Sequence, residues 1–438
     1  MKNKPFVRLT ALVLCTGSLL AGCKKPAEPA EPAHVHTFTD WTLQATASCK
    51  YEGREDRYCT ECGEKEERPI PKTPHDLGAY NICRTCSAVE FDEDAALVEL
   101  GNVVAPWYDA GAVANCPWDL VVWDGILYRA AGDYDKNSGI TPIWGYNIAD
   151  KTWKLTGEAK DEALHRFIDI CGILTSPGID PRQDWRLGNF HILQDGAWRQ
   201  VRNLPNGVHN FDMVGFDDKI FAGLGVEEGN SPCVMSTNGG QTFDFVPLYK
   251  DGQKVDTKGK TYIRIYEYMV YQNQLYALVS LDSDYSFYRF ETDKLVYVGD
   301  ARRYIVSDRS SFNYLNSKIE WGDTLYMVNN VLWAMKDFAD PSANKVVKMP
   351  NGEKVADALL LGDALYTLAY AQKADGTYET VIYKSATGAE GSFTEVLRFD
   401  YAVPPCSFTQ DSGYFYIGMG SKKMIHTANG MVMRAKMP

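Results

Sequence analysis

The chain has 438 residues, a formal net charge of −12 and a hydrophobic fraction of 45%, which is enough for a sizeable packed core. The negative charge argues against nucleic acid or an anionic membrane surface as an electrostatic partner. Aromatic residues make up 12% of the chain and include 26 tyrosines, a bias typical of β structure.

Residues 1–22 are predicted to be a lipoprotein signal peptide. Positive charges at residues 2, 4 and 8 precede a mostly apolar stretch, 11–20, which is too short to span a bilayer as a helix. The segment Leu20-Ala21-Gly22-Cys23 resembles a bacterial lipobox, which implies cleavage before Cys23 and lipid attachment to that cysteine. The alternative is an ordinary secretory signal that happens to contain a cysteine. Lys24 is not the Asp that resembles an inner-membrane retention signal, so an outer-membrane or cell-surface position is expected.

Residues 23–33 are predicted to form an extended tether. Proline recurs every third residue in the sequence KKPAEPAEPA of residues 24–33. Proline blocks both helix and sheet, and proline-rich chains extend by about 3 Å per residue. The tether would hold the rest of the protein away from the membrane.

Residues 34–90 are predicted to form a small Cys/His module with a structural zinc site. Cys59-Thr-Glu-Cys62 and Cys83-Arg-Thr-Cys86 are two CxxC turns about twenty residues apart, which is the spacing of a zinc ribbon. Each turn directs two thiolates to one point, so the two turns together are expected to complete a tetrahedron. Gly63 follows the first turn, where such backbones often need a positive φ.

Further possible metal ligands in this module are His36, Cys49 and His75, which could serve a second site. The stretch from His36 to His75 resembles small Cys/His repeats of bacterial surface proteins, with a shortened second unit in which Ser87 replaces the usual Gly. This resemblance implies a metal-stabilised spacer or binding module. Disulfides are the competing interpretation, because an exported protein may be oxidised. In both cases a segment with so little core needs a covalent or metal cross-link.

Residues 95–438 are predicted to form an all-β propeller of about seven blades. An apolar residue, a turn pair and a short strand ending in Tyr or Phe recur every roughly 40 to 55 residues. The copies are residues 123–128, 216–221, 271–276, 321–326, 361–366 and 410–416, with a degraded copy at 170–174. Residues 97–101 look like a closing strand that precedes the first blade, so they are expected to complete the last blade and close the ring.

One blade contains Ser236-Thr-Asn-Gly-Gly-Gln-Thr-Phe243, with a weaker relative between Lys384 and Phe393. These segments resemble the Asp-box of sialidase-type propellers, with Asn238 in place of the Asp. The resemblance implies a structural hairpin on the outside of a blade and no catalysis. A sialidase is itself not expected, because its early Phe-Arg-Ile/Leu-Pro motif is absent from the sequence.

Loops that lead into the first three blades contain the candidate ligand-binding residues. These are Trp118, Asp119, His165, Arg166, Asp169, Trp185, His209 and Asp212, and Trp123 and Tyr134 offer further stacking surfaces. Two segments, 165–169 and 208–213, share a His followed by an Asp, and such a pair could bind a ligand or transfer protons. A structural role is the simpler interpretation, in which the Asp binds turn amides and the His contacts a neighbouring blade. No catalytic residue is assigned.

The remaining cysteines, Cys116, Cys171, Cys233 and Cys406, are scattered through the repeats. The sequence leaves buried thiols and one or two disulfides equally open. The expected protein is a lipid-anchored, exported binding or scaffold protein with a glycan, peptide or protein ligand, with structural zinc and no nucleic-acid partner. A glycan-active enzyme, either a hydrolase or a lyase, is the alternative.

Overall fold

The computed structural model describes residues 34–107, 113–132, 139–282, 284–301 and 315–438. The predicted signal peptide, Cys23, the tether and Tyr134 lie outside these residues. The chain divides into two compact units, Met1–Pro74 and His75–Pro438. The module predicted at residues 34–90 is therefore divided, because its second CxxC turn belongs to the same unit as the repeats.

The first unit contains a three-stranded antiparallel sheet of β1 (Thr42–Ala45), β2 (Gly53–Tyr58) and β3 (Lys65–Ile70). Of residues 34–74, Gly53, Asp56 and Cys59 alone are buried. Its main side-chain stack is cationic and aromatic, since the guanidinium groups of Arg57 and Arg68 lie 4.6 and 4.3 Å from the centre of the Trp41 ring. So small an apolar core favours a fold that depends on a cross-link.

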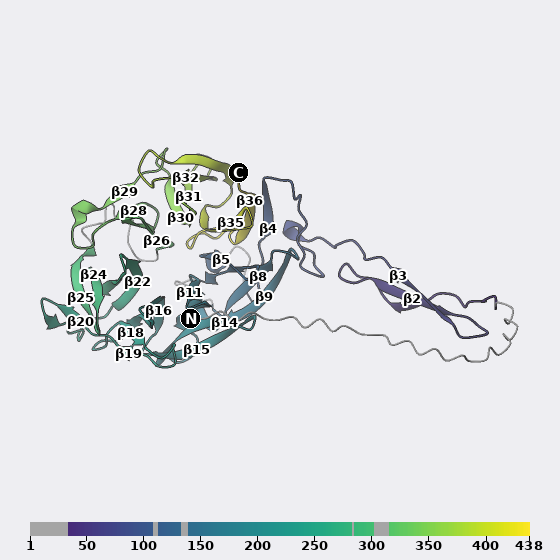
Figure 1. The fold of residues 1–438 in the computed structure, drawn as a ribbon, viewed down its shortest axis with the longest axis horizontal. Helices are drawn as coiled ribbons and strands as arrows, with labels where there is room; N and C mark the ends of the chain where they lie inside the picture. Colours follow the sequence, from purple (N-terminus) through teal and green to yellow (C-terminus); the bar gives the residue numbers. More distant parts are fainter. Residues whose placement is uncertain (1–33, 108–112, 133–138, 283, 302–314) are drawn as a thin grey trace, which may run out of the picture. The chain divides into compact units, whose positions relative to one another are not determined.

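The second unit contains seven four-stranded antiparallel groups of strands among its described residues, which confirms the predicted β-propeller architecture. Figure 1 shows them following one another around a ring, with β5, β16, β22 and β26 on its inner side. The first three blades are β5 (Leu120–Trp123), β6 (Ile126–Arg129), β8 (Thr141–Asn147), β9 (Thr152–Ala159); β11 (Ile168–Ile170), β12 (Ile173–Pro177), β14 (Leu187–Gln194), β15 (Ala197–Pro205); and β16 (His209–Phe216), β17 (Lys219–Val226), β18 (Cys233–Ser236), β19 (Asp244–Phe245).

The next three blades repeat the same order. They are β22 (Ile263–Tyr271), β23 (Gln274–Leu281), β24 (Asp284–Glu291), β25 (Lys294–Asp300); β26 (Ser317–Trp321), β27 (Thr324–Val328), β28 (Leu332–Met335), β29 (Lys345–Val347); and β30 (Lys354–Leu361), β31 (Ala364–Gln372), β32 (Tyr378–Ser385), β33 (Thr394–Tyr401). The third and fourth blades belong to one larger sheet, because the ends of β17 and β22 also pair.

The last blade closes the ring with a strand from the other end of the repeats. It consists of β34 (Pro405–Asp411), β35 (Tyr414–Met419), β36 (Met431–Lys436) and β4 (Leu97–Gly101). The partners across the closing pair include Val432 with Gly101 and Arg434 with Val98. The predicted closure is confirmed, and Leu100 on β4 is fully buried. Hydrogen bonds along β4 thus join the two ends of the ring.

Each repeat motif is the hairpin between the first and second strands of a blade. Its turn residues take positive φ, for example 49° at Asp124 and 75° at Gly125, as type I′ hairpin turns require. The strand after the turn then buries its apolar and aromatic residues between sheets, as Leu127 and Tyr128 do. The repeat therefore marks both a tight turn and the contact between neighbouring blades.

The segment that resembles an Asp-box connects β18 to β19 and has the expected local hydrogen bonds. The Asn238 side-chain oxygen accepts from the Thr242 N–H at 3.0 Å, and Ser236 Oγ accepts from the Gly240 N–H at 2.9 Å. Phe243 is buried against Phe190 of the preceding blade. The segment therefore stabilises the contact between two blades.

Short strands outside the blades are β7 (Ala131–Gly132), β10 (Asp161–Leu164), β13 (Ile179–Pro181), β20 (Leu248–Lys250) and β21 (Gln253–Lys254). Helical structure is limited, over the described ranges, to the 3-10 turns η1 (Ala79–Asn81), η2 (Val113–Asn115) and η4 (Pro341–Ala343). In this part of the chain there is no helix with the length and apolar character needed to cross a bilayer.

Candidate metal groups and ligand-binding face

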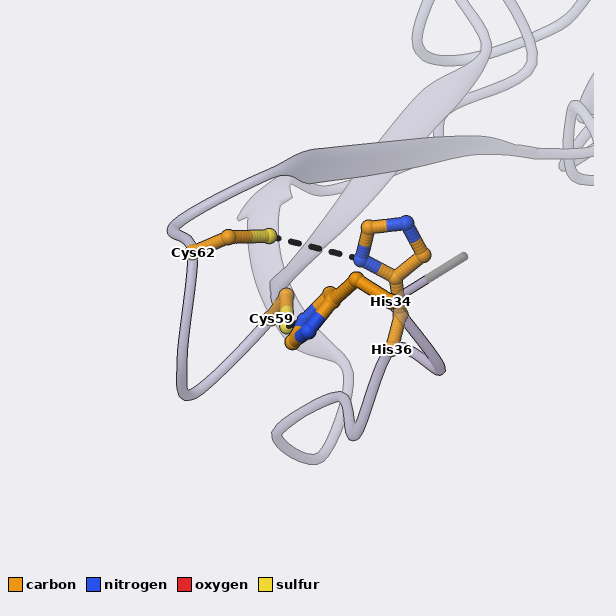
Figure 2. A group of neighbouring side chains, drawn as sticks. All are labelled: His34, His36, Cys59 and Cys62. Atoms are coloured by element: carbon orange, nitrogen blue, oxygen red, sulfur yellow. Dashed lines mark hydrogen bonds between the residues drawn. The ribbon is translucent and has the colours of Figure 1, made fainter. Parts of the chain in front are cut away.

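The first CxxC turn lies against two histidines from the start of the first unit. Figure 2 shows His34, His36, Cys59 and Cys62 converging on one point. The Sγ of Cys59 lies 3.3 Å from His34 Nε2, and the Sγ of Cys62 lies 3.3 Å from His36 Nδ1. All four ligand atoms lie within 4.8 Å of one another.

These spacings suit a tetrahedral zinc ion. With Zn–N and Zn–S bonds of about 2.0–2.3 Å, the ligand atoms of a tetrahedron lie roughly 3.3–3.8 Å apart. Hydrogen bonding to His34 is the first of several interactions that lower the pKa of the Cys59 thiol to about 5, so the group is poised to supply a thiolate. His34 was not among the predicted ligands. Its signal is the His34-x-His36 pair, which mirrors the two thiols of the turn.

The second CxxC turn has a histidine of its own within the second unit. Cys86 Sγ lies 3.3 Å from His75 Nδ1, and Cys83 is buried beside them. The turn packs on the first blade, since the Val89 N–H donates to Lys151 O at 2.8 Å. Burial raises the pKa of the Cys83 thiol, but backbone N–H groups of Cys86 and Thr85 and the His75 ring outweigh it and lower the pKa to about 6.

The structure gives each CxxC turn histidine neighbours of its own, and the prediction that the two turns share one ion stays a prediction. Each turn meets histidine nitrogen, with His36 at the first turn and His75 at the second. The physical reason is that β2 and β3 place the first turn against His34 and His36, while the segment after the second turn is hydrogen-bonded to the first blade. Cys49 is half-buried in the first unit, and its role as a ligand stays a prediction.

A ring of polar side chains stands at one equivalent position of all seven blades, in the inner strand or up to two residues before it. The reference point in each blade is the residue just before the hairpin turn pair, and each member of the ring lies four residues before that point. The members are Asp119, Arg166, Asp212, Glu267, Ser317, Asp357 and Ser407. In four blades the pairing register shifts just before this position, as between Asn210 and Asp212. Such a bulge re-aims the side chain away from the normal alternation of a strand.

Each of the four carboxylates in this ring joins its own blade to the next. The two oxygens of Asp119 accept from the N–H groups of Leu120 at 2.8 Å and Phe167 at 2.7 Å. Asp357 likewise accepts from Ala358 in its own strand and from Phe408 in the next blade, both at 2.9 Å. Burial raises the pKa of Asp119 to about 7 and that of Asp357 to about 6.

Two cations neutralise the buried carboxylates of the third and fourth blades. Arg166 lies 3.1 Å from Asp212 and donates to both oxygens of Glu267 at 2.9 and 3.0 Å. The ammonium group of Lys318 lies 2.5 Å from Asp212 and 3.0 Å from Glu267. The exposed fractions of Asp212 and Glu267 are 1% and 0%. Because every member is paired and desolvated, this network holds the blades together.

Three of the predicted ligand residues are thus structural. Asp119 and Asp212 accept from backbone N–H groups, whereas Arg166 bonds Asp212, Glu267 and the Leu315 carbonyl. Burial lowers the pKa of His165 well below the usual value and so favours the neutral imidazole, whose Nε2 accepts a hydrogen bond from Arg166 Nε at 3.0 Å. Glu267, Lys318 and Asp357 were not predicted. Glu267 and Asp357 lie at the same distance before their turns as the other ring members, and Lys318 lies one residue after that position.

His209 and Asp180 form an ion pair at the start of β16, where β13 pairs with it. Both side chains are half-buried. Gly225 permits the approach of His209, because a Cβ at that glycine would lie 2.6 Å from the His209 ring. Asp180 takes a φ of 53°, a conformation that a residue other than Gly adopts at a cost. This pair is therefore held in place by strand pairing and by close contact.

Arg264 lies beside this pair on an aromatic platform. Its guanidinium carbon lies 5.0, 5.5 and 5.9 Å from the ring centres of Tyr262, Phe211 and Tyr266. It donates to the Tyr266 hydroxyl at 3.1 Å. Tyr262 is 53% exposed, so the platform reaches solvent. We name Asp180, His209, Tyr262 and Arg264 the mouth cluster; Arg264 and Tyr262 were not predicted.

The remaining predicted residues lie apart from this cluster. Asp169 is exposed and its carboxylate accepts from the Gly172 N–H at 2.7 Å, so it caps the β11–β12 hairpin. It is not the equivalent of Asp212, because Arg166 holds that position. Trp185 is 60% exposed on the connection between β13 and β14, whereas Trp118 is buried beneath the ammonium group of Lys422, 4.4 Å from its ring centre. Trp123 packs into the core of the first blade.

No family model matches the chain, and no curated protein matches it. Solved structures similar to it include the Swd1 β-propeller domain of Myceliophteria thermophila, which is 12% identical over 72% of this chain and 93% of that one, with a TM-score of 0.42. BamB from Moraxella catarrhalis is 11% identical over 72% and 81%, with a TM-score of 0.36. An ulvan lyase is 13% identical over 77% and 94%, with a TM-score of 0.40. The strand pairing itself shows the fold.

Proposed function

We propose that the chain is a membrane-anchored, exported binding protein whose propeller presents the mouth cluster to a ligand. The observation that carries this proposal is the use of the inner-strand carboxylates, which bond backbone amides and buried cations. A carboxyl group can act in acid–base chemistry only where it reaches the substrate. Carboxylates of the kind that glycoside hydrolysis uses in pairs are here occupied in joining blades.

The ligand class follows from the mouth cluster. A guanidinium has five N–H donors in a planar fork that matches a carboxylate or sulfate group. Arg264 lies near three aromatic rings and donates to the Tyr266 hydroxyl, so part of its side-chain freedom is already lost before binding. Tyr262 offers an exposed ring beside it, and sugar or side-chain faces stack on such rings. We therefore favour an acidic glycan or a peptide carboxylate as the ligand.

The anchor follows from the sequence alone, through the lipobox at Leu20–Cys23 and the proline-rich tether. A lipid on Cys23 would attach the chain to the outer membrane or cell surface. Labelling of growing cells with a radioactive fatty acid, compared with a Cys23→Ala variant, tests this part separately from ligand binding. Label on the unchanged chain and none on the variant is the expected result.

Each Cys/His group is proposed to hold one structural zinc ion. The chemistry of the donors supports this, since thiolate and imidazole are the preferred zinc ligands. Mass spectrometry of metal content should give two zinc ions per chain. One ion should remain when Cys59 and Cys62 are both changed to Ser, and likewise when Cys83 and Cys86 are both changed to Ser. A Cys49→Ser variant tests whether that thiol also binds metal. A Cys59–Cys62 disulfide in the isolated protein would reject zinc at the first group.

Binding is tested with residues 24–438 on arrays of glycans and of peptides. The expected ligands bear carboxylate or sulfate groups, and binding should fall at least tenfold in Arg264→Gln. Arg199→Gln is the matched control, because Arg199 is exposed on β15 away from the cluster. Equal binding by the two variants would reject the mouth cluster as the ligand site.

A glycan-active enzyme is the second candidate, and the His209–Asp180 pair is the observation in its favour. An imidazole held by a carboxylate can transfer protons, and Arg264 could hold an acidic sugar. Incubation with a panel of acidic polysaccharides, read by reducing ends and by absorbance of unsaturated products, tests it. Product formation that disappears in His209→Ala would favour the enzyme over the binding protein.

A further inference from the structure

We propose that Cys116 and Cys406 are a redox-modified pair, whose disulfide locks the first blade to the last when the protein is oxidised. The sequence left the partners of these cysteines open. Their sulfur atoms lie 3.7 Å apart, although 290 residues separate them in the chain. A disulfide has an S–S distance of about 2.05 Å, so the two sulfurs need to approach by roughly 1.7 Å.

The two cysteines lie where the ring closes. Cys116 precedes β5 of the first blade, and Cys406 is in β34 of the last. Next to them Ser407 Oγ donates to Pro117 O at 2.6 Å, and Cys406 Sγ donates to the same oxygen at 3.1 Å. The backbones of the two blades are therefore already held together at this point, and the bond would add a covalent link to the hydrogen-bonded closure by β4.

The short distance between the two sulfurs sets this pair apart from the other described thiols of the propeller. Cys406 is half-buried and so the more accessible of the two, while Cys116 is buried behind it. Burial raises the pKa of the Cys406 thiol well above its usual value, and the ammonium group of Lys422 offsets this only in part, so the proximity of the two sulfurs carries the proposal. Cys233 differs, because it is buried beside the Tyr268 hydroxyl at 3.2 Å. Cys171 is exposed on a hairpin turn.

The oxidant is a disulfide donor of the thiol–disulfide exchange class, such as oxidised glutathione or a disulfide-carrying oxidoreductase. The Cys406 thiolate attacks one sulfur of the donor, which forms a mixed disulfide and releases one donor thiol. The Cys116 thiolate then attacks the Cys406 sulfur and releases the second donor thiol. Two cysteine thiols are oxidised and one donor disulfide is reduced to two thiols, so atoms and electrons balance.

The experiment uses the full chain, isolated from cells after acid quenching and alkylation, and a second sample oxidised with glutathione. Peptide mapping without reductant should find the Cys116 peptide linked to the Cys406 peptide, with Cys233 alkylated as a free thiol after unfolding. The bond should raise the melting temperature of the propeller by roughly 3–6 °C, and dithiothreitol should reverse this gain. Zinc is kept in the buffer so that the Cys/His groups do not contribute.

Variants make the test specific. Cys406→Ala and Cys116→Ala should each abolish the linked peptide and the response to dithiothreitol, whereas Cys233→Ala should keep both. The predicted export of the protein determines only when the disulfide forms, not whether the two thiols can form it. Linkage by glutathione in vitro without linkage in cells supports the pair and argues against an oxidising location. Two alkylated thiols at Cys116 and Cys406 after glutathione treatment, in a folded protein, would overturn it.

Discussion

Asp212 on β16 accepts a hydrogen bond from the backbone N–H of Tyr268, on the inner strand of the next blade, at 2.7 Å. The same carboxylate accepts from the Met213 N–H at 3.0 Å and lies 3.1 Å from Arg166. One side chain thus fixes its own strand, the neighbouring blade and a buried cation. This relationship explains why the repeat carries a polar residue at the centre of an apolar ring.

We expect Asp212→Ala to destabilise the propeller by about 3–5 kcal/mol. The substitution leaves Arg166 and Lys318 with one carboxylate between them and leaves the Tyr268 N–H without its acceptor, and breaking a buried pair costs about that much. Urea unfolding followed by tryptophan fluorescence measures the effect. Glu158→Gln removes one exposed charge on β9 and is expected to change stability by less than about 0.5 kcal/mol. Equal effects of the two substitutions would contradict the structural role.

Asp119 should make the propeller less stable as the pH rises from about 4 to 7. Burial raises its folded-state pKa to about 7, while the unfolded carboxyl has a pKa near 3.9. Between these values the folded state holds the extra proton, so ionisation favours the unfolded state and the cost grows to roughly 2–4 kcal/mol above pH 7. Below pH 4 the cost is absent.

The Asp119→Asn variant tests this linkage. Its amide does not titrate, so the difference in unfolding free energy between the variant and the unchanged protein should shift in favour of the variant from pH 4.5 to pH 7.5. Any loss of hydrogen bonding by the amide is independent of pH and does not alter that trend. Parallel stability curves over this range would show that Asp119 ionises normally.

The two CxxC turns are followed by different residues, which gives an opposed pair of substitutions. Gly63 takes a φ of 75° and its N–H donates to Cys59 O, and Ser87 takes a φ of 59° with the same bond to Cys83 O. Glycine adopts positive φ without strain. Ser87→Gly should therefore stabilise the second turn by up to about 1 kcal/mol, and Gly63→Ala should weaken the first by about the same amount. The retention of metal in the presence of a chelator, measured for each turn, checks both the expected gain in stability and the expected loss.

His34→Ala tests the ligand that the sequence did not reveal. Its Nε2 lies 3.3 Å from Cys59 Sγ, so its removal should lower zinc content by up to one ion per chain, or weaken the first site at least tenfold against a chelator. His426→Ala is the control, since His426 is exposed near β36. If zinc content and affinity match those of the control, His34 is a bystander and the first group has another fourth ligand.

Much of the architecture could be predicted from the sequence, because local constraints that recur in each repeat determine it. A turn pair such as Asp124-Gly125 demands positive φ, and the Leu127-Tyr128 strand that follows demands burial, so the repeat predicts hairpins and blades wherever it recurs. The closing strand at Leu97–Gly101 was predictable for the same reason, since it copies the pattern of other outer strands.

The tertiary structure alone decided what those polar residues do. Asp119 and Asp212 were predicted for the ligand site, but the ring turns them towards the amides of the next blade, and no local pattern encodes a partner 48 or 56 residues away. The two CxxC turns have the spacing of one zinc ribbon, yet each pairs with histidine, because β2 and β3 place the first turn against His34 and His36 while the segment after the second is bonded to the first blade. Cys116 and Cys406 meet only because the ring closes. Local conformation follows from neighbouring residues, whereas these contacts follow from closure of the whole chain.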